Sequence, residues 1–267
     1  MNATFLDNLL VKLQLIGQEL LRLQSSTELV VEFKSDASPK SNGDDYSHTE
    51  LMAFFNLQNI GDPIISEEGD LTQLEEYPSY WIIDPLDGTR EYIAGTPEFS
   101  ICIAHVTQGK PDFGVIYAPF YNKAIGVDFN RDVFCWEHGH FSSLSAPVVS
   151  KKPYVIVSNF SYEKPRLDRF ISLLEQSCLV GDIERRSQSS AIKFMLLAEG
   201  QVHLYPKLGR IMQWDMAAGM CICEALGIPV TDLSGKSINL YSKQMDQFGF
   251  FMGDYQPKFT QIYQDLA

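Results

Sequence analysis

The chain has 267 residues, of which 45% are apolar and 12% aromatic, and its formal net charge is −13. This length suits one large domain or two packed lobes, and the apolar fraction provides a substantial core. The negative charge argues against a nucleic-acid polymer or an anionic membrane as a non-specific partner, because both are polyanions. A small anionic substrate stays compatible with it wherever bound cations reverse the local field.

The N-terminal segment predicts an amphipathic helix and not a targeting signal. Its apolar residues recur at helical spacing: Phe5, Leu9, Leu13, Ile16 and Leu20. Charged residues interrupt the segment, and no basic region precedes it. No apolar run in the chain is long enough for a membrane span. The five cysteines form no CxxC pair, which favours reduced, buried thiols in a cytoplasmic enzyme.

The predicted elements divide the chain into an N-terminal α+β lobe, residues 1–150, and a C-terminal α/β lobe, residues 151–267. In the first lobe we expect a strand at 27–33, a polar loop at 34–45, a helix at 47–57, strands within 62–70 and 80–85, a meander at 99–129 and a hairpin at 133–144. In the second lobe strands at 154–159 and 202–207 alternate with helices at 166–177, 189–201 and 214–227. That alternation is typical of an α/β layer.

The stretch YWIIDPLDGT, residues 80–89, combines an apolar strand with two aspartates three residues apart. Asp84 falls at the carboxyl end of the strand, where α/β folds commonly place groups that contact ligands. Two carboxylates as close as Asp84 and Asp87 repel each other unless a proton or a cation lies between them. Oxygen ligands without a nearby thiol or imidazole favour Mg²⁺ or Mn²⁺ over zinc. Gly88 permits close backbone approach, and Thr89 is placed to open a short helix, so this pattern indicates phosphoryl chemistry.

This stretch has three other interpretations. Asp-Gly is a common turn dipeptide, so Asp87 alone is more typical of a turn residue than of a ligand. An EF-hand loop that starts at Asp84 needs oxygen ligands where Leu86 and Gly88 stand, and a glutamate where Gly95 stands, which excludes it. An aspartyl-phosphate phosphatase pairs acids two residues apart, which disfavours that class for acids three apart.

Further acids have plain structural interpretations when each is taken alone. Glu67, which follows the apolar pair at 64–65, is more often a solvated loop residue. Asp215 precedes a predicted helix, where aspartate is a favoured N-cap. Asp44 and Asp45 lie in the predicted polar loop, where they would be solvated. No one of these residues establishes a site.

Taken together, the segments SEE, DPLDGT and WDMAAG resemble the magnesium-dependent, lithium-sensitive phosphatases related to inositol monophosphatase. The resemblance runs in the same order from about Ser38 to Gly253. Within that superfamily the segments DPLDGTREYIAGTPEFSICIAHV and SSAIKFMLLAEGQVHLYPK are most similar to the 3'(2'),5'-bisphosphate nucleotidases. The resemblance implies a layered α-β-α-β-α fold of the sugar-phosphatase type, with two lobes and the metal site between them.

The resemblance also implies a set of metal ligands for two or three Mg²⁺ ions. Glu67 is then a ligand that also takes part in catalysis, and Asp84 bridges two ions. The carbonyl of Leu86 completes one coordination shell. Asp87 and Asp215 hold the second ion. Bound cations of this kind neutralise phosphate oxygens, lower the pKa of water and stabilise the leaving alkoxide, so no protein nucleophile is needed.

The catalytic and phosphate-binding residues follow from the same resemblance. Gly88 and Thr89 would receive the scissile phosphate, and the Thr89 hydroxyl would orient the attacking water. Asp44 matches the acid that the family pairs with this threonine in water activation. The family segment reads SPVTxAD, whereas this chain has SPKSNGD, so that Lys40 stands for a small apolar residue and Ser41 for threonine.

The substrate's other end is expected at basic residues of the second lobe. Ser190 and Lys193 lie three residues apart on a predicted helix face and occupy the family's substrate segment. Lys207 is a further substrate-binding candidate, and a surface role is an equal alternative for Lys207 and Arg210. The nucleotidases often carry SRSH after the first strand of this lobe, whereas residues 158–161 here read SNFS.

The resulting hypothesis is a phosphomonoesterase that hydrolyses 3'-phosphoadenosine 5'-phosphate to AMP and phosphate. An inositol mono- or polyphosphate phosphatase is the alternative within the enzyme class. A non-catalytic phosphate sensor on the same fold is a different class, and the complete acid set argues against it. The expected partner is a small phosphate ester, with no nucleic-acid polymer, no membrane insertion and a monomer or homodimer as the assembly.

Overall fold

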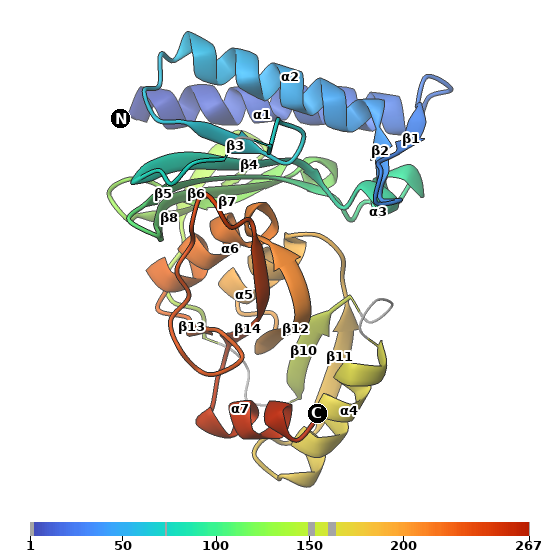
Figure 1. Ribbon diagram of the computed structural model, residues 1–267, viewed down its shortest axis with the longest axis vertical. Coiled ribbons are helices and arrows are strands. Elements are labelled where there is room, and N and C mark those ends of the chain that lie inside the picture. The colour runs from blue at the N-terminus through green and yellow to red at the C-terminus, as the bar shows by residue number, and fades with distance from the viewer. Residues whose placement is uncertain (1–2, 73, 149–152, 160–163, 267) are drawn as a thin grey trace.

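The structure is a computed structural model that describes residues 3–72, 74–148, 153–159 and 164–266. Figure 1 shows five layers: a helical layer, a large sheet, a second helical layer, a smaller sheet and a third helical layer. This α-β-α-β-α order confirms the predicted fold class. Among the described residues, no helix combines the length and the apolarity that crossing a membrane requires.

The first helical layer consists of α1 (Ala3–Gln24) and α2 (Asn42–Leu57), joined through the hairpin of β1 (Val31–Phe33) and β2 (Pro39–Ser41). The predicted N-terminal helix is therefore confirmed, and its apolar face is buried against the sheet. The prediction of a polar loop at 34–45 is wrong in part, because β2 and the first turn of α2 occupy its second half. Helix α2 begins five residues before the expected Ser47, since the Ser41 side chain caps it.

The large sheet has seven strands in the order β3-β4-β5-β6-β7-β8-β9. Its strands are β3 (Ile64–Ser66), β4 (Ser79–Asp87), β5 (Ser100–Thr107), β6 (Lys110–Ala118), β7 (Lys123–Val127), β8 (Val133–Glu137) and β9 (His140–Ser143). Strands β3 and β4 are parallel, and the remaining neighbours are antiparallel. The predicted meander and hairpin are confirmed. The short helices α3 (Thr89–Ile93) and η1 (Pro119–Tyr121) follow β4 and β6.

The smaller sheet has five strands in the order β11-β10-β12-β14-β13. Its strands are β10 (Tyr154–Ser158), β11 (Ile183–Ser187), β12 (Leu204–Met212), β13 (Val230–Thr231) and β14 (Asp246–Gly253). The helices of this half are α4 (Lys164–Gln176), α5 (Ile192–Ala198), α6 (Gln213–Ala225) and α7 (Pro257–Gln264). Strands β11, β13 and β14 and helix α7 are additional to the predicted elements. The lobe boundary expected at residues 150 and 151 lies outside the described residues.

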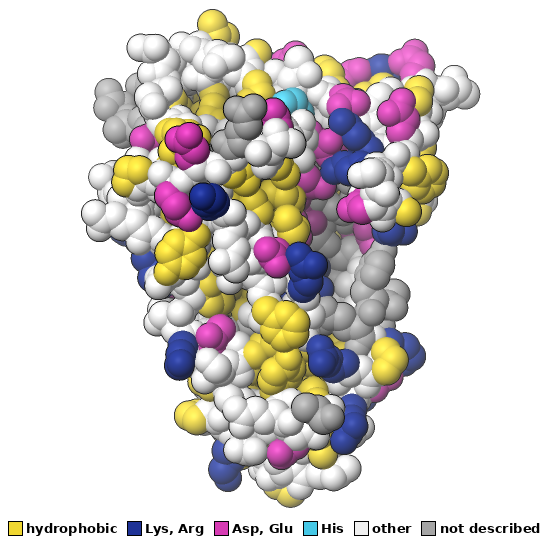
Figure 2. All heavy atoms as spheres, viewed as in Figure 1, with side chains coloured by type: hydrophobic (Ala, Val, Ile, Leu, Met, Phe, Trp, Pro, Cys, Tyr) yellow, Lys and Arg dark blue, Asp and Glu magenta, His cyan; other side chains and the backbone are white. Residues whose placement is uncertain are grey.

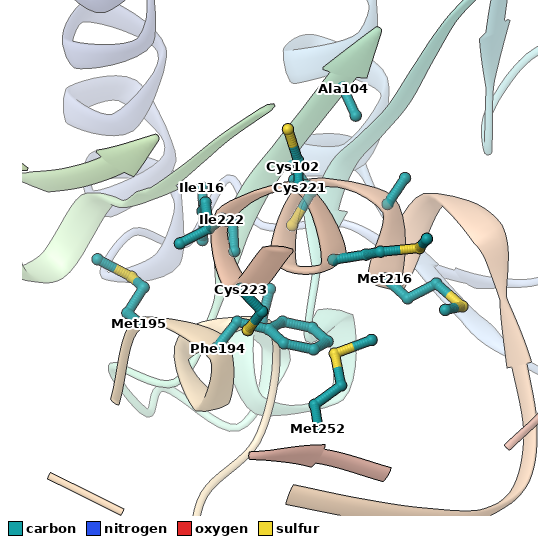
Figure 3. Close-up of a cluster of buried hydrophobic side chains, with 14 of the residues drawn as sticks. Cys102, Ala104, Ile116, Phe194, Met195, Met216, Cys221, Ile222, Cys223 and Met252 are labelled. Carbon is teal, nitrogen blue, oxygen red and sulfur yellow. The ribbon is translucent and has the colours of Figure 1, made fainter. Parts of the chain in front are cut away.

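The two sheets share one hydrophobic core, in which α5 and α6 are buried between them. Figure 3 shows Cys102 and Ile116 of the large sheet facing Cys221 and Ile222 of α6, with Met252 of the smaller sheet beneath. A second core lies between α1, α2 and the large sheet. All five cysteines are free; four are buried as expected, but Cys178 is exposed, which corrects the prediction for that residue.

Candidate active site

The end of strand β4 brings two aspartates and a glycine turn to one edge of the large sheet. Asp84 pairs with Cys102 and Asp87 with Ser100, with a register shift between the two pairs. This bulge lets the two intervening residues fit without breaking the strand. Gly88 has a φ of +94°, and an added Cβ would lie 2.7 Å from the carbonyl oxygen of Glu98. Only glycine is therefore free of strain at this turn.

Three carboxylates from separate elements converge next to this turn. Glu67 follows β3, Asp84 lies on β4 and Asp215 lies in the first turn of α6. One oxygen of each lies within 4.8 Å of the others. We call Glu67, Asp84 and Asp215 the carboxylate cluster. Asp215 is the third residue of α6 and not its N-cap, which is Met212, so the N-cap interpretation is wrong.

The electrostatics of the carboxylate cluster are unfavourable for three ionised acids. Burial raises the pKa of Asp84 well above its usual value, and Glu67, Asp87 and Asp215 raise it further. Burial, followed by Asp87 and Glu67, likewise raises the pKa of Asp215. Burial also raises the pKa of Glu67, although Lys34 opposes the shift. Protons or a cation must relieve this repulsion, and the all-oxygen donor set fits a hard cation such as Mg²⁺.

Asp87 lies beside the carboxylate cluster but already has hydrogen-bond donors. Its Oδ2 accepts from the backbone N–H of Ala191 and, at 3.2 Å, from the Ser100 hydroxyl. Burial raises its pKa, while the ammonium group of Lys193 acts against the shift. Asp87 nevertheless lines the same hollow of about 310 Å³ as the carboxylate cluster and Leu86. Each of the five expected metal ligands therefore borders one space.

Thr89 lines this hollow and contacts the buried Asp44. The Thr89 hydroxyl donates to Asp44 Oδ1 at 2.9 Å and is 3.2 Å from the Leu86 carbonyl oxygen. Asp44 was expected in a loop, but it lies in the first turn of α2 and is 3% exposed. Its other oxygen accepts from the N–H and the hydroxyl of Ser41, at 2.7 and 2.6 Å. The substitution of serine for the family's threonine thus keeps a hydroxyl at this position.

A second hollow of about 230 Å³ adjoins the first, because Asp87, Gly88 and Asp215 line both. Its far wall contains all four basic or polar candidates for the substrate's other end: Ser190, Lys193, Lys207 and Arg210. Ser158 and Asn159 also line it, whereas Phe160 and Ser161 of the SNFS segment lie outside the described residues. The structure therefore gathers the candidates that the sequence separates by 20 residues.

The expected helix face for Ser190 and Lys193 is wrong, since α5 begins only at Ile192. Ser190 precedes the helix with a φ of +55°, and its carbonyl accepts from Lys193 Nζ at 2.6 Å. Lys193 is 6% exposed and lies 5.2 Å from the ring centre of Tyr205. Burial lowers the pKa of Lys193, and Asp87 opposes the shift. Arg210 is exposed and pairs with Asp246 at 2.9 Å, in agreement with the surface alternative.

Sequence reasoning missed two lysines that contact this site from the β1–β2 hairpin. Lys34 Nζ lies 2.8 Å from Glu67 and 2.7 Å from Glu68. Lys40 lies 2.9 Å from Glu68 and also pairs with Asp45. Figure 2 shows acidic and basic side chains gathered in the hollowed part of this face, beneath the hairpin end of the helical layer. Lys34 and Glu67 are 33 positions apart, so no local sequence pattern predicts their contact. Lys40 did carry a signal in the sequence, because it stands where the family segment has a small apolar residue.

Comparisons with known proteins agree with this architecture. The sequence profile of the Inositol monophosphatase family matches residues 3–257. The 3'(2'),5'-bisphosphate nucleotidase CysQ of Escherichia coli K12 is 31% identical over 226 residues, which cover 84% of this chain and 88% of that protein. The crystal structure of CysQ from Bacteroides thetaiotaomicron, a bacterial member of the inositol monophosphatase family, superposes with a TM-score of 0.75 at 26% identity, covering 92% of this chain and 95% of the other.

A third relative extends the comparison of folds. The structure of an IMPase/NADP phosphatase complexed with Mg²⁺ and phosphate has a TM-score of 0.78 at 21% identity, and covers 96% of this chain and 94% of its own. The similarity to the two CysQ proteins identifies the chain as a phosphatase. The chain belongs to the inositol monophosphatase family.

Proposed function

We propose that the protein is a Mg²⁺-dependent phosphomonoesterase with its catalytic centre at the carboxylate cluster. The observation that carries the proposal is that Glu67, Asp84 and Asp215 approach within 4.8 Å while their pKa values are raised. Asp87 and the carbonyl of Leu86 would complete the ligand set. Two or three ions are the expected occupancy. When bound, Mg²⁺ lowers the pKa of water and neutralises charge on the phosphoryl oxygens and on the leaving group.

The chain's own groups have separate tasks in this reaction. Thr89 donates its hydroxyl proton to Asp44, so its oxygen lone pairs face away from that bond and can accept from the attacking water. Asp44, held in place by Ser41, fixes this orientation and can receive the proton through Thr89. Gly88 lines both hollows and Thr89 lines the first, so the scissile phosphate would lie where the two hollows adjoin. No side chain needs to act as a nucleophile.

Within this reaction we propose 3'-phosphoadenosine 5'-phosphate as the substrate, with AMP and phosphate as products. The named CysQ relatives support this choice, and so does the pairing of two adjoining hollows. A bisphosphate needs one site for the scissile phosphate and a second for the other anion. Lys193 and Lys207 in the second hollow can supply the second site.

An inositol phosphate is the second candidate substrate, and one observation favours it. Ser158 and Asn159 line the second hollow, and the sequence SNFS that they begin lacks the arginine and histidine that the nucleotidases often carry in this segment. Recognition of a base or ribose would then depend on other groups. A polyol hydroxyl needs only neutral hydrogen-bond partners such as these.

The deciding experiment is a phosphate-release screen with 3'-phosphoadenosine 5'-phosphate, 3'-AMP and inositol 1-phosphate, with Mg²⁺ or with chelator. We expect the bisphosphate to have the highest kcat/KM and chelator to abolish turnover. Lys193→Ala should raise KM for the bisphosphate by roughly ten- to a hundredfold more than for 3'-AMP, from a lost charged hydrogen bond of about 1.5–3 kcal/mol. A preference for inositol 1-phosphate would overturn the substrate and leave the metal phosphatase in place. Lithium inhibition, a cytoplasmic location and the oligomeric state stay predictions.

A further inference from the structure

Five charged side chains of alternating sign form a continuous chain from the carboxylate cluster to helix α2. In order these are Glu67, Lys34, Glu68, Lys40 and Asp45. The N–O distances along it are 2.8, 2.7, 2.9 and 2.5 Å. We call these five residues the charge chain. Its two lysines share the central glutamate, and each also contacts an acid of its own.

The burial of the charge chain differs along its length. The side chain of Glu68 is 5% exposed, so its negative charge depends on the two lysines and not on water. The side chains of Lys34 and Lys40 are 27% and 23% exposed, whereas that of Asp45 is 60% exposed. Interactions at the Glu68 end are therefore less screened than those at the Asp45 end.

Lys40 is the member of the charge chain that departs from the family segment, where a small apolar residue is usual. Without Lys40, Glu68 would have Lys34 as its cationic partner and would attract it more strongly. Lys34 would then interact less with Glu67, because one ammonium group is shared between the two acids. Lys34 lies 2.8 Å from Glu67 and 2.7 Å from Glu68, and removal of Lys40 would shift this balance toward Glu68.

We propose that Lys40 is a positioning residue that weakens Mg²⁺ binding by holding Lys34 on Glu67. This inference rests on the proposed function, in which Glu67 is a metal ligand. The Lys34 ammonium and Mg²⁺ compete for the same carboxylate, so a stronger Lys34–Glu67 pair gives a weaker metal site. The charge chain thus sets the Mg²⁺ concentration at which the enzyme becomes occupied.

The test is isothermal titration of Mg²⁺ into chelator-treated, dialysed protein, which measures binding without turnover. Lys40→Met keeps the aliphatic part of the side chain and removes the charge. We expect it to lower the Mg²⁺ Kd by roughly two- to fivefold, the range for one partly exposed ion pair. Lys12→Met is the matched control, because Lys12 pairs with Glu50 between α1 and α2 and lies outside the charge chain. Its Kd should equal that of the wild type.

A second variant tests the opposite direction and keeps the inference falsifiable if Lys40→Met folds poorly. Asp45→Asn removes the other acid that Lys40 contacts, at an exposed position that tolerates change. Lys40 should then bind Glu68 more closely, Lys34 should move toward Glu67, and the Mg²⁺ Kd should rise. If Lys40→Met and Asp45→Asn change the Mg²⁺ Kd in the same direction, the inference is overturned, because loss of local structure would change both values alike.

The Lys34→Met background separates action through Lys34 from a direct electric field of Lys40. If Lys40 acts through Lys34, Lys40→Met changes the Kd of the wild type but not that of Lys34→Met. An equal change in both backgrounds, or no change in the wild type, overturns the inference and leaves the proposed function intact. A wild-type protein that binds no Mg²⁺ overturns the proposed function itself.

Discussion

Polar clusters lie at both ends of strands β4 and β5, and the two clusters differ in how their buried charges are compensated. At one end lies the carboxylate cluster beside Asp84. At the other end His105 forms hydrogen bonds with Asp112 at 2.7 Å and with Asp62 at 3.1 Å. A protonated imidazole therefore lies between two carboxylates, whose charge is opposite to its own. We call these three residues the histidine cluster.

The directions of the pKa shifts express this difference. In the histidine cluster burial acts to lower the pKa of His105, but Asp112 and Asp62 outweigh it and raise the value. The pKa of Asp62 is lowered, first by the Ser79 hydroxyl and then by His105. In the carboxylate cluster all the acids have raised pKa values instead. The histidine cluster is thus neutralised within the chain, whereas the carboxylate cluster requires protons or a cation to relieve its repulsion.

The largest expected effect comes from Asp84→Asn. In the wild type Asp84 Oδ1 accepts a hydrogen bond of 3.0 Å from the backbone N–H of Leu86, and the amide oxygen of asparagine can accept the same bond. The substitution keeps the shape of the side chain but removes a charge that the proposed ions would share. We expect phosphate release to fall by about 10³-fold or more, equivalent to about 4 kcal/mol. The free energy of unfolding in chelator should stay the same or increase, because one source of repulsion is gone. Near-normal turnover by this variant would rule out the site.

Two hydroxyl–carboxylate hydrogen bonds give a matched comparison of the clusters. Thr89 donates to Asp44 at 2.9 Å, and Thr107 donates to Asp112 at 2.8 Å. Thr89→Val should lower kcat by roughly 10²–10⁴-fold because proton transfer and water orientation are lost. Thr89→Ser should keep most of the activity. Thr107→Val should reduce stability by about 1 kcal/mol with kcat unchanged, and an equal loss of kcat in both valine variants would contradict the assignment.

The Mg²⁺-induced change in the free energy of unfolding, measured by calorimetry or urea titration, should depend on the carboxylate cluster and not on the histidine cluster. Mg²⁺ at about 100 times its Kd should raise the free energy of unfolding of the wild type by about 2.7 kcal/mol, since ligand bound to the native state stabilises it. His105→Gln should show the same increase from a lower starting stability. Asp84→Asn should show little or none. A Mg²⁺-induced increase in Asp84→Asn as large as in the wild type would place the ions elsewhere.

The sequence predicted those parts of the site that lie in local patterns. Asp84, Asp87 and Gly88 are contiguous with a strongly apolar strand, so the strand and the glycine turn were predictable, although β4 continues through Asp87 and not only to the expected residue 85. Glu67 was placed correctly after a short strand, but its approach to Asp215 depends on the pairing of β3 with β4 and on the packing of α6 against β4. Roles for these residues came from the family resemblance, because carboxylates before a helix also act as caps.

The errors occur where a side chain changes the local backbone. The Ser41 cap starts α2 early and turns the expected loop position of Asp44 into a buried helical one. Ser190 has a positive φ, and α5 therefore begins only at Ile192. Ser190 was expected to bind substrate through its side chain, but its carbonyl oxygen accepts a hydrogen bond from Lys193. The charge chain joins residues far apart in sequence, and no periodicity can reveal such pairs. Long-range charge pairing and single residues in unusual conformations therefore required the structure.

The smallest expected effect concerns pH and the histidine cluster. The raised pKa of His105 means that its contribution to stability is full below the unfolded pKa of about 6.5 and is lost as pH rises through the folded value. The acids contribute above their unfolded pKa of about 3.9, so the cluster is strongest between these limits. His105→Gln should therefore lower the free energy of unfolding by about 1–2 kcal/mol at pH 6 and by less at pH 9. The value at pH 6 is modest because solvent screens the partly exposed carboxylates of Asp62 and Asp112. Urea denaturation of both proteins at the two pH values measures this difference. A cost that is independent of pH, or larger at pH 9, would show that His105 stabilises the sheet through packing against Trp81 and not through its charge.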